Sequence, residues 1–301
     1  MKKITLLVAC FGITTASICS AQEVDLLQLL DSTNASKTGK EFSIATFKTT
    51  RLINQQTLET LGKRTLDFRI SHRFGDINGG TYNAFGLDGS ANIRIGLDYS
   101  YDGRFMFGIG RSSFEKLADG FLKYRLLRQT TNNSMPVSMT LFSSINYTLL
   151  KDPTQNTTGF DKYENRSSRL SYAAQVIIGR KFNSKFSLQL APTFIHYNLV
   201  QQIRDKNDMY SIAFASRYKL TKRFAITGEY VLRLNKYSNE FSNYHNSLGF
   251  GFDLETGGHV FQIHITNSFG INEVQYIPYT TTSWKNLGVR LGFNISRVFN
   301  L

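Results

Sequence analysis

Hydrophobic and polar residues alternate along the C-terminal stretch of the chain, residues 287–301. Every second position is apolar, and the residues between are small or polar; the apolar set begins with Leu287, Val289, Leu291, Phe293 and Ile295. A β-strand directs alternate side chains to opposite faces, so the stretch predicts a strand with one apolar face. That face fits either a soluble sandwich, where it packs on a second sheet, or an outer-membrane barrel, where it meets lipid.

The same alternation recurs from residue 65 onward and predicts about twelve strands in a meander, with fourteen as the other count considered. An even number is typical of single-chain bacterial barrels. The predicted strands are 65–74, 90–101, 104–110, 120–129, 137–149, 169–182, 185–198, 209–220, 224–235, 246–254, 259–268 and 287–298.

The connections between these strands alternate between tight and long without exception. The tight ones are 102–103, 130–136, 183–184, 221–223 and 255–258, and the long ones are 75–89, 111–119, 150–168, 199–208, 236–245 and 269–286. Transmembrane barrels have short periplasmic turns and longer external loops, whereas a sandwich predicts no such asymmetry. The pattern therefore predicts an all-β, antiparallel transmembrane barrel in the outer membrane, with both termini periplasmic.

The N-terminus carries the features of a secretory signal peptide. Lys2 and Lys3 precede a mostly apolar core, and small residues end it at Ala21. We predict a signal peptide at 1–21, a periplasmic lead-in at 22–63 that plugs or braces the barrel mouth, and a barrel at 64–301. Cys10 and Cys19 both fall in the signal peptide, which excludes disulfides and thiolate metal sites in the mature chain.

Charged residues collect on the strand parity opposite to the apolar one. A charge that faces lipid at the bilayer midplane costs roughly 2–4 kcal/mol, so these residues must point into the lumen. The predicted lumen-lining set is Asp67, Arg69, Arg73, Arg94, Asp98, Lys123, Arg125, Arg217, Glu229, Arg233, Asp253, His264 and Arg290. Their carboxylates are expected to pair with nearby arginines, as in Asp67 with Arg69 and Arg94 with Asp98. The sequence leaves open whether this network lines a pore or fills the barrel.

The chain is strongly basic, with a formal net charge of +13, or +11 once Lys2 and Lys3 are removed. An exported chain does not meet nucleic acid, so we expect no nucleic-acid partner. The excess favours lipid phosphates or a lumen that accepts anions. The expected partners are outer-membrane lipids, lipopolysaccharide and the barrel-insertion machinery, and the oligomeric state is left open.

Several segments resemble an uncharacterised family of outer-membrane β-barrels, known only as a domain of unknown function. The similar segments are 46–54, 59–63, 66–75 and 119–129, of which 66–75 is the most specific: Leu-Asp-Phe-Arg-Ile-Ser-His-Arg-Phe-Gly. The resemblance runs from about residue 22 to the C-terminus. It implies the barrel fold and the outer membrane, and it implies no activity and no catalytic residue.

Candidate chemistry is sparse. Ser71 and His72 are adjacent in a predicted strand, so they face opposite ways and cannot form a nucleophile–base pair. The five histidines are scattered without ligand spacing, and we expect no metal and no cofactor. In the predicted external loop 269–286, the aromatic residues Tyr276, Tyr279 and Trp284 either contact a ligand or, as we favour, fold over the barrel mouth.

The sequence therefore predicts an outer-membrane barrel of unestablished activity and no enzyme. A narrow pore for small, anionic solutes is the leading interpretation. A filled structural barrel without transport is the alternative, and a lipid-modifying enzyme is a further one.

Overall fold

The computed structural model describes residues 41–151, 163, 165–200, 205–235 and 244–301. The predicted signal peptide and residues 22–40 of the lead-in lie outside these ranges. The strands of the described chain are β1 (Thr65–Asp76), β2 (Asn92–Ser100), β3 (Phe105–Ser112), β4 (Leu117–Leu127), β5 (Ser138–Thr148), β6 (Leu170–Lys181), β7 (Phe186–Tyr197), β8 (Asp208–Lys219), β9 (Phe224–Arg233), β10 (Leu248–Thr256), β11 (His259–Thr266) and β12 (Arg290–Asn300). Short helical turns lie between them: η1 (Ile77–Gly86), η2 (Phe114–Lys116), η3 (Arg166–Arg169), α2 (Glu273–Tyr276) and η4 (Trp284–Asn286).

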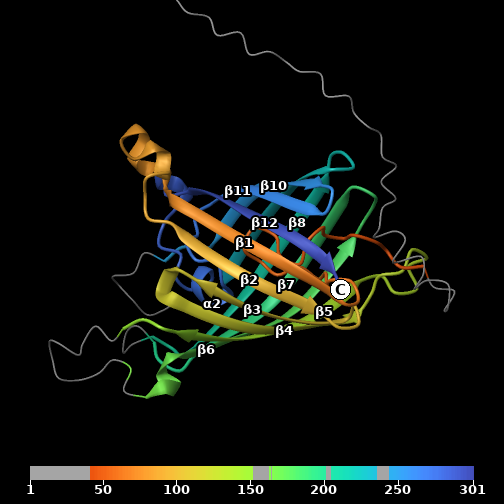
Figure 1. Ribbon diagram of the computed structural model, residues 1–301, viewed down its shortest axis with the longest axis horizontal. Helices are drawn as coiled ribbons and strands as arrows, with labels where there is room; N and C mark the ends of the chain where they lie inside the picture. The colour runs from red at the N-terminus through yellow and green to blue at the C-terminus, as the bar shows by residue number, and fades with distance from the viewer. Residues whose placement is uncertain (1–40, 152–162, 164, 201–204, 236–243) are drawn as a thin grey trace, which may run out of the picture. The chain divides into compact units, whose positions relative to one another are not determined.

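These strands form a closed antiparallel barrel in which each strand pairs with its sequence neighbours (Figure 1). Strand β1 closes the ring because it pairs with both β2 and β12, with Arg69 opposite Gly96 on one side and Ser296 on the other. The predicted twelve-stranded meander barrel is confirmed.

The alternation of the sequence becomes an inner and an outer face. Along β1, Asp67, Arg69 and Arg73 are buried while Phe68 is exposed to the outside. Large apolar side chains are exposed around the outer wall and include Ile95, Leu97, Ile109, Leu122, Ile145, Ile226, Phe250 and Ile263. An apolar band of this extent does not occur on a water-soluble monomer and fits a wall that faces lipid.

No helix in the described ranges is both long and apolar enough to cross a membrane.

The barrel has two rims. The terminal rim carries the start of β1, the end of β12 and the connections 101–104, 128–137, 182–185, 220–223 and 257–258. The loop rim carries the remaining connections, including 267–289. Both ends of the barrel domain meet at the terminal rim, where the N–H of Leu301 donates to the carbonyl of Arg64 at 2.9 Å.

The predicted alternation of tight and long connections fails at two connections, one at each end of β4. The connection 113–116 at the loop rim is tight, and 128–137 at the terminal rim is long. The prediction ended the long connection 111–119 at Asp119 and began the next strand at Gly120. In the structure both residues lie inside β4, where Asp119 pairs with Gly110 and Gly120 pairs with Ile109.

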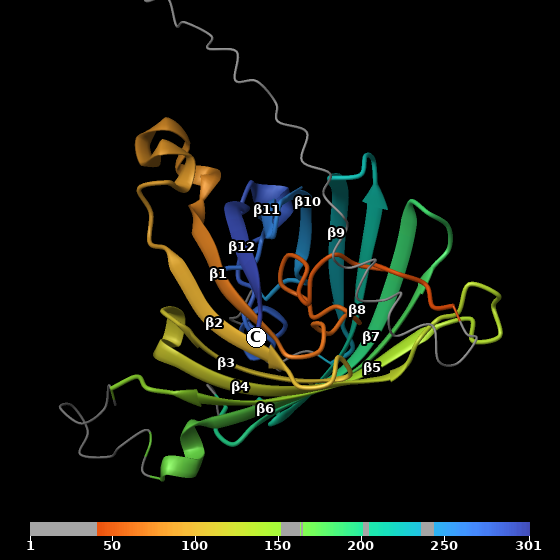
Figure 2. The same cartoon turned by 45° about the vertical axis from the view of Figure 1, so that its right-hand side comes forward.

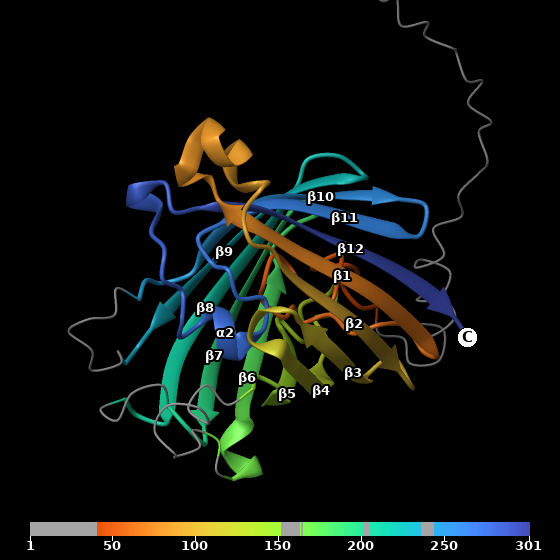
Figure 3. The ribbon, with the colours of Figure 1, turned by 60° about the vertical axis from the view of Figure 1, so that its left-hand side comes forward.

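Two segments fold into the barrel from opposite rims. The lumen hairpin, residues 46–61, enters the barrel from the terminal rim (Figure 2). Its side chains are buried except those of Lys48 and Glu59, which are half-buried. Its turn is closed by the Leu52 N–H, which donates to the Gln55 carbonyl at 2.8 Å. The α2 loop, residues 267–289, comes from the loop rim and places α2 next to β6 (Figure 3).

Candidate functional site

The predicted lumen-lining charges all lie on the inward parity of their strands. Arg125 and Arg233 are half-buried, and the others are buried: Asp67, Arg69, Arg73, Arg94, Asp98, Lys123, Arg217, Glu229, Asp253, His264 and Arg290. Their contacts decide what the interior can do. Many of them bind the lumen hairpin.

Lys123 holds both strands of the hairpin together. Its ammonium donates to the carbonyls of Thr50, Thr57 and Glu59 at 2.9, 3.1 and 3.2 Å. An ammonium has three donors and no acceptor, so all its hydrogen-bonding capacity is used by hairpin backbone.

Glu229 binds the tip of the hairpin from the opposite side. Its carboxylate accepts from the Asn54 N–H at 3.0 Å, the Gln55 N–H at 3.1 Å and the Asn54 side-chain amide at 2.8 Å. The turn at 52–55 leaves these backbone donors unpaired within the hairpin, and the carboxylate satisfies them.

Arg69 and Arg73 of β1 add further wall contacts to the hairpin. Arg73 donates to the Ile53 carbonyl at 2.6 Å and to the Asn54 side-chain oxygen at 2.9 Å. Arg69 donates to the Thr50 hydroxyl at 2.9 Å. These arginines therefore position a polypeptide segment inside the barrel.

Other wall charges pair with each other. Arg94 makes a bidentate pair with Asp119 at 2.9 and 2.5 Å. The sequence analysis expected Asp98 as its partner and assigned Asp119 to a loop, so it missed this pair. The Arg94 guanidinium fits beside β2 because residue 96 is a glycine. A Cβ at Gly96 would lie 2.7 Å from the guanidinium, which is closer than real Cβ atoms come to other atoms. The expected pair of Asp67 and Arg69 is present at 2.9 Å.

The α2 loop fills the lumen from the other rim. Tyr276 is fully buried, which differs from its predicted place in an external loop over the mouth. The loop folds inward because the Asn272 side chain caps α2 by accepting from the Val274 N–H at 3.2 Å, and the Tyr197 hydroxyl donates to the Val274 carbonyl. Burial raises the pKa of the Tyr276 phenol well above its usual range.

The other two aromatic residues of the predicted external loop lie nearer the rim. Tyr279 packs edge-on against Tyr197, with ring centroids 5.6 Å apart. Trp284 donates its indole N–H to the Leu248 carbonyl at 3.0 Å and packs edge-on against Phe250. Both residues thus contact the barrel's own strands.

The hairpin and the α2 loop meet at one buried ion pair. Arg51 donates to the Glu273 carboxylate at 3.2 Å, and the Gln56 side chain donates to the same oxygen at 3.2 Å. Arg51 is 3% exposed and Glu273 is 0% exposed. Burial lowers the pKa of the Arg51 guanidinium, and the adjacent Glu273 carboxylate opposes that shift. The lumen thus holds two segments that come from opposite rims and meet at this ion pair.

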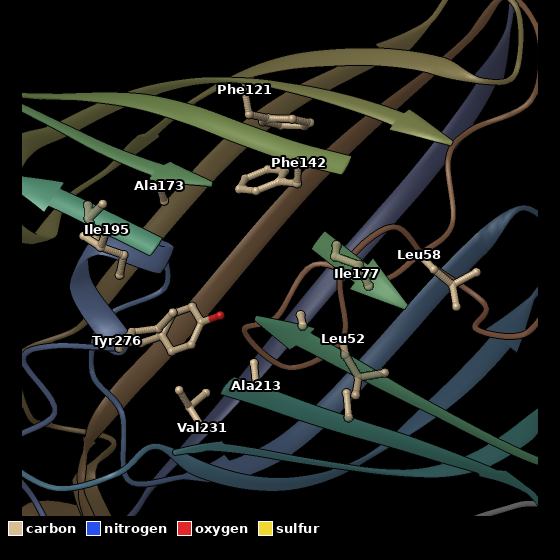
Figure 4. Close-up of a cluster of buried hydrophobic side chains, with 14 of the residues drawn as sticks. Leu52, Leu58, Phe121, Phe142, Ala173, Ile177, Ile195, Ala213, Val231 and Tyr276 are labelled. Carbon is tan, nitrogen blue, oxygen red and sulfur yellow. The ribbon is translucent and has the colours of Figure 1, made fainter. Parts of the chain in front are cut away.

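A second part of the inner wall is apolar, and the sequence analysis did not assign it. Inward side chains of β3–β9, most of them on β6–β9, form a cluster with Leu52 and Leu58 of the hairpin and Tyr276 of the α2 loop (Figure 4). The wall residues of this cluster include Ala173, Ile177, Ala191, Ile195, Met209, Ala213 and Val231. Runs such as 176–178, where three consecutive residues are apolar, hide which one points inward.

A histidine–carboxylate pair near the loop rim also escaped the sequence analysis. His196 Nδ1 lies 2.6 Å from Asp208 Oδ1, because β7 and β8 place these residues directly opposite each other. Within the described ranges Asp208 is the only hydrogen-bond partner of the His196 ring. Ser71 is buried while His72 faces outward and stacks on Phe293 at 5.1 Å.

Within the described ranges, no group of three or more histidine, cysteine or acidic side chains could hold a metal ion.

A closed barrel with an apolar outer wall and a charged interior is a membrane-spanning β-barrel. The chain belongs to the family described as "Membrane bound beta barrel domain (DUF5777)", which matches residues 47–299. The match includes the lumen hairpin, so the hairpin and the barrel together make up the family's domain.

Solved structures with some similarity include other barrels. The NanC porin is 10% identical, with coverage of 78% of this chain and 99% of that chain, at a TM-score of 0.48. The COG4313 outer membrane channel from Pseudomonas putida F1 is 16% identical (80% and 98% covered, TM-score 0.42). Outer membrane phospholipase A from Escherichia coli, as an active-site mutant, is 9% identical (79% and 91% covered, TM-score 0.41). No curated protein matches the chain.

Proposed function

We propose that the protein is an outer-membrane channel for small solutes whose lumen is closed at rest by the lumen hairpin and the α2 loop. It is not an enzyme, and both ends of the barrel domain lie on the periplasmic side. The observation that carries the proposal is that the charged part of the inner wall binds the hairpin through hydrogen bonds to backbone atoms.

Polar contacts of this kind support a plug that can be displaced. A hydrogen bond to a charged group contributes a net free energy of only about 1.5–3 kcal/mol, because water replaces the lost partner when the bond opens. Bonds from Lys123 and Arg73 to hairpin carbonyls can therefore be exchanged for bonds to water or to a solute. The path opens between the hairpin and the charged wall, while the hairpin stays on the apolar wall.

The charges exposed along such a path favour anions weakly. Inward cationic side chains of β1, β2, β4 and β12 outnumber the inward carboxylates of the same strands. One of these carboxylates, Asp119, already pairs with Arg94. Rings of positive charge favour anions in a pore. Partial neutralisation by Asp67 and Asp98 keeps the expected selectivity small.

Two other functions receive less support. A permanently filled structural barrel is favoured by the burial of the Arg51–Glu273 pair, since separating buried charges is costly.

A lipid-modifying enzyme would use the outward His196–Asp208 pair as base and orienting group, and it also needs a nucleophile within hydrogen-bond reach. To test this alternative, phospholipid and lipopolysaccharide are incubated with the purified protein. We expect their mass spectra to be unchanged.

A reversible crosslink of the hairpin tip to the wall tests the channel. A Cβ at Gly249 would lie 3.4 Å from Cγ2 of Ile53, which takes about the place of a cysteine Sγ, so cysteines at these two positions are within crosslinking reach. The sequence after residue 21 contains no other cysteine. In planar bilayers we expect the reduced Ile53→Cys/Gly249→Cys variant to open transiently with a small anion preference, and to fall silent on oxidation.

The two single-cysteine variants are the controls, and their conductance should not respond to oxidation. Silence of the wild-type protein and of the reduced double variant under all voltages would contradict the channel and support a structural barrel.

A further inference from the structure

Two basic side chains lie next to each other on the outer wall at the terminal rim. His259 is the first residue of β11, directly after the turn 257–258, and Arg297 lies near the end of β12. The pairing of β11 with β12 places the two residues directly opposite each other. Both point outward, since their strand neighbours Val260 and Ser296 are buried on the inward face. We call them the rim pair.

Arg297 adds a permanent positive charge to an otherwise apolar part of the wall. Its outward neighbours along β12 are Ile295 and Phe299, and across the sheet it faces Phe68 of β1. A charge on the lipid-facing wall is costly at the bilayer midplane and far less costly near the headgroups. The side chain extends toward the rim, because its guanidinium carbon lies 4.9 Å from the centroid of the Phe299 ring, two residues nearer the strand end.

The protein does not use the hydrogen-bonding groups of the rim pair. Among the described residues, neither side chain takes part in a hydrogen bond or an ion pair. The His259 ring stacks on Phe261 with ring centroids 6.1 Å apart, and Arg297 lies over Phe299. Stacking on an aromatic face orients a guanidinium and leaves its N–H edge available for an anion.

No acidic side chain of the described sheet neutralises the rim pair from the same face. Asp67 and Asp253 are buried on the inward face, and Glu255 pairs with Lys48 of the lumen hairpin. The outward residues around the pair are apolar or uncharged: Phe68, Thr256, Phe261, Ile295 and Phe299. A protonated histidine directly opposite an arginine destabilises a strand pair, and an anion between the two groups removes that repulsion.

The outward charges differ between the two rims. At the terminal rim, the outward charged or titratable residues within the described strands are Arg180, His259 and Arg297, all of them basic. At the loop rim the same parity carries the carboxylate of Asp208 as well as Arg111. The terminal end of the outer wall is therefore the end that attracts anionic headgroups.

The place of the rim pair in the membrane defines the anion. Strand ends lie at the level of the lipid headgroups. A guanidinium binds phosphate oxygens with paired hydrogen bonds, and an imidazole N–H can add another. We propose that the rim pair binds the headgroup phosphate of an anionic phospholipid, with the acyl chains lying along Phe261, Ile263 and Ile295 on the outer wall. Binding does not depend on whether the barrel conducts.

Lipid retention by the purified, detergent-solubilised protein tests the site. The probes are phosphatidylglycerol, phosphatidylcholine and inorganic phosphate, added separately after delipidation and counted by native mass spectrometry. We expect phosphatidylglycerol to be retained in preference to phosphatidylcholine. Arg297→Gln should weaken its binding about tenfold or more, because charge-assisted contacts are lost, and His259→Gln should weaken it about threefold.

Two further variants keep the result interpretable. Arg111→Gln removes the same charge from the outward face at the loop rim, where Arg111 faces the uncharged Ile95 and Ala118, and should bind phosphatidylglycerol like the wild type. Arg297→Lys keeps the charge but loses the paired donors, and should give an intermediate affinity. Heat-dependent gel mobility verifies that each variant is folded.

Four results would overturn the assignment. These are equal retention of phosphatidylglycerol and phosphatidylcholine, undiminished binding by Arg297→Gln or by His259→Gln, a loss in Arg111→Gln as large as that in Arg297→Gln, and binding of inorganic phosphate as tight as that of the lipid.

Discussion

The two parts of the inner wall bind the same hairpin in different ways. The charged wall, β1, β2, β4 and β10–β12, uses Arg73 and Lys123 to hydrogen-bond hairpin carbonyls and Arg69 to hydrogen-bond the Thr50 hydroxyl. The apolar wall, centred on β6–β9 and extended by Phe121 of β4 and Phe142 of β5, packs Ile177, Ile195 and its other apolar residues against the hairpin and the α2 loop. Two polar residues of this wall also bind the hairpin: Glu229 of β9 binds its tip, and Gln189 of β7 bonds the Leu58 N–H and the Gln56 carbonyl.

The difference shows why the barrel needs an occupied lumen. A charged wall can face water, but an apolar wall that faces water loses about 25 cal/mol for each Å² left uncovered. The hairpin therefore acts as a hydrophobic core for one half of the barrel and as a polar ligand for the other half. Opening along the charged wall is the less costly route.

The largest effect should come from removing the carboxylate that binds the hairpin tip. Glu229→Ala leaves the N–H groups of Asn54 and Gln55 buried without an acceptor, at an expected cost of about 3–5 kcal/mol in the free energy of unfolding. Denaturant unfolding in lipid vesicles measures the loss. Hydrogen exchange at residues 52–55 should rise at the same time.

Glu229→Gln is the matched control, because its amide oxygen still accepts from the tip and the loss should be clearly smaller. Equal losses in the two variants would show that the carboxylate contributes packing rather than hydrogen bonds.

Truncation on the apolar wall should give a smaller loss of another kind. Ile177 is fully buried, so Ile177→Ala creates a cavity and should cost about 2–4 kcal/mol. Hydrogen exchange at the hairpin tip should stay at the wild-type level, because the tip contacts are untouched. Increased exchange at 52–55 in this variant would mean that the two walls do not act separately.

Asp102, which belongs to neither wall, should give the smallest effect on the free energy of unfolding, and that effect should depend on pH. The pKa of Asp102 in the 101–104 turn is lowered, chiefly by the hydrogen bond from the Phe105 N–H. Its contribution to stability is thus present above the unfolded pKa of about 3.9 and is lost as pH falls through the lower folded value.

The denaturant midpoints of wild type and Asp102→Ala should therefore differ at pH 6 and converge as the pH falls through the lowered pKa of Asp102. A difference that persists at low pH would exclude the carboxylate as its source.

The strands could be predicted because one face of each meets lipid and the alternation has period two. The C-terminal strand and β1, with Asp67, Arg69 and Arg73 between apolar neighbours, are clear examples. The alternation fails as a guide where both faces are apolar. Ile177 and Ile195 therefore received no inward assignment.

What fills the lumen could not be predicted, because the contacts are between residues far apart in sequence. Arg51 and Glu273 are separated by most of the barrel, and nothing local marks either one as a partner. Tyr276 was assigned to an external loop because connections at that rim are usually long and exposed. Its burial depends on the space left by the small and branched residues of β6–β9.

Conductance of a barrel without its hairpin tests the central claim most directly. In the variant, residues 46–61 are replaced by a short Gly/Ser linker, and heat-dependent gel mobility establishes that the barrel is folded. We predict steady conductance with a small anion preference in planar bilayers, compared with rare openings of the wild type. A folded variant that stays as closed as the wild-type protein would contradict the claim that the hairpin closes a path through the lumen.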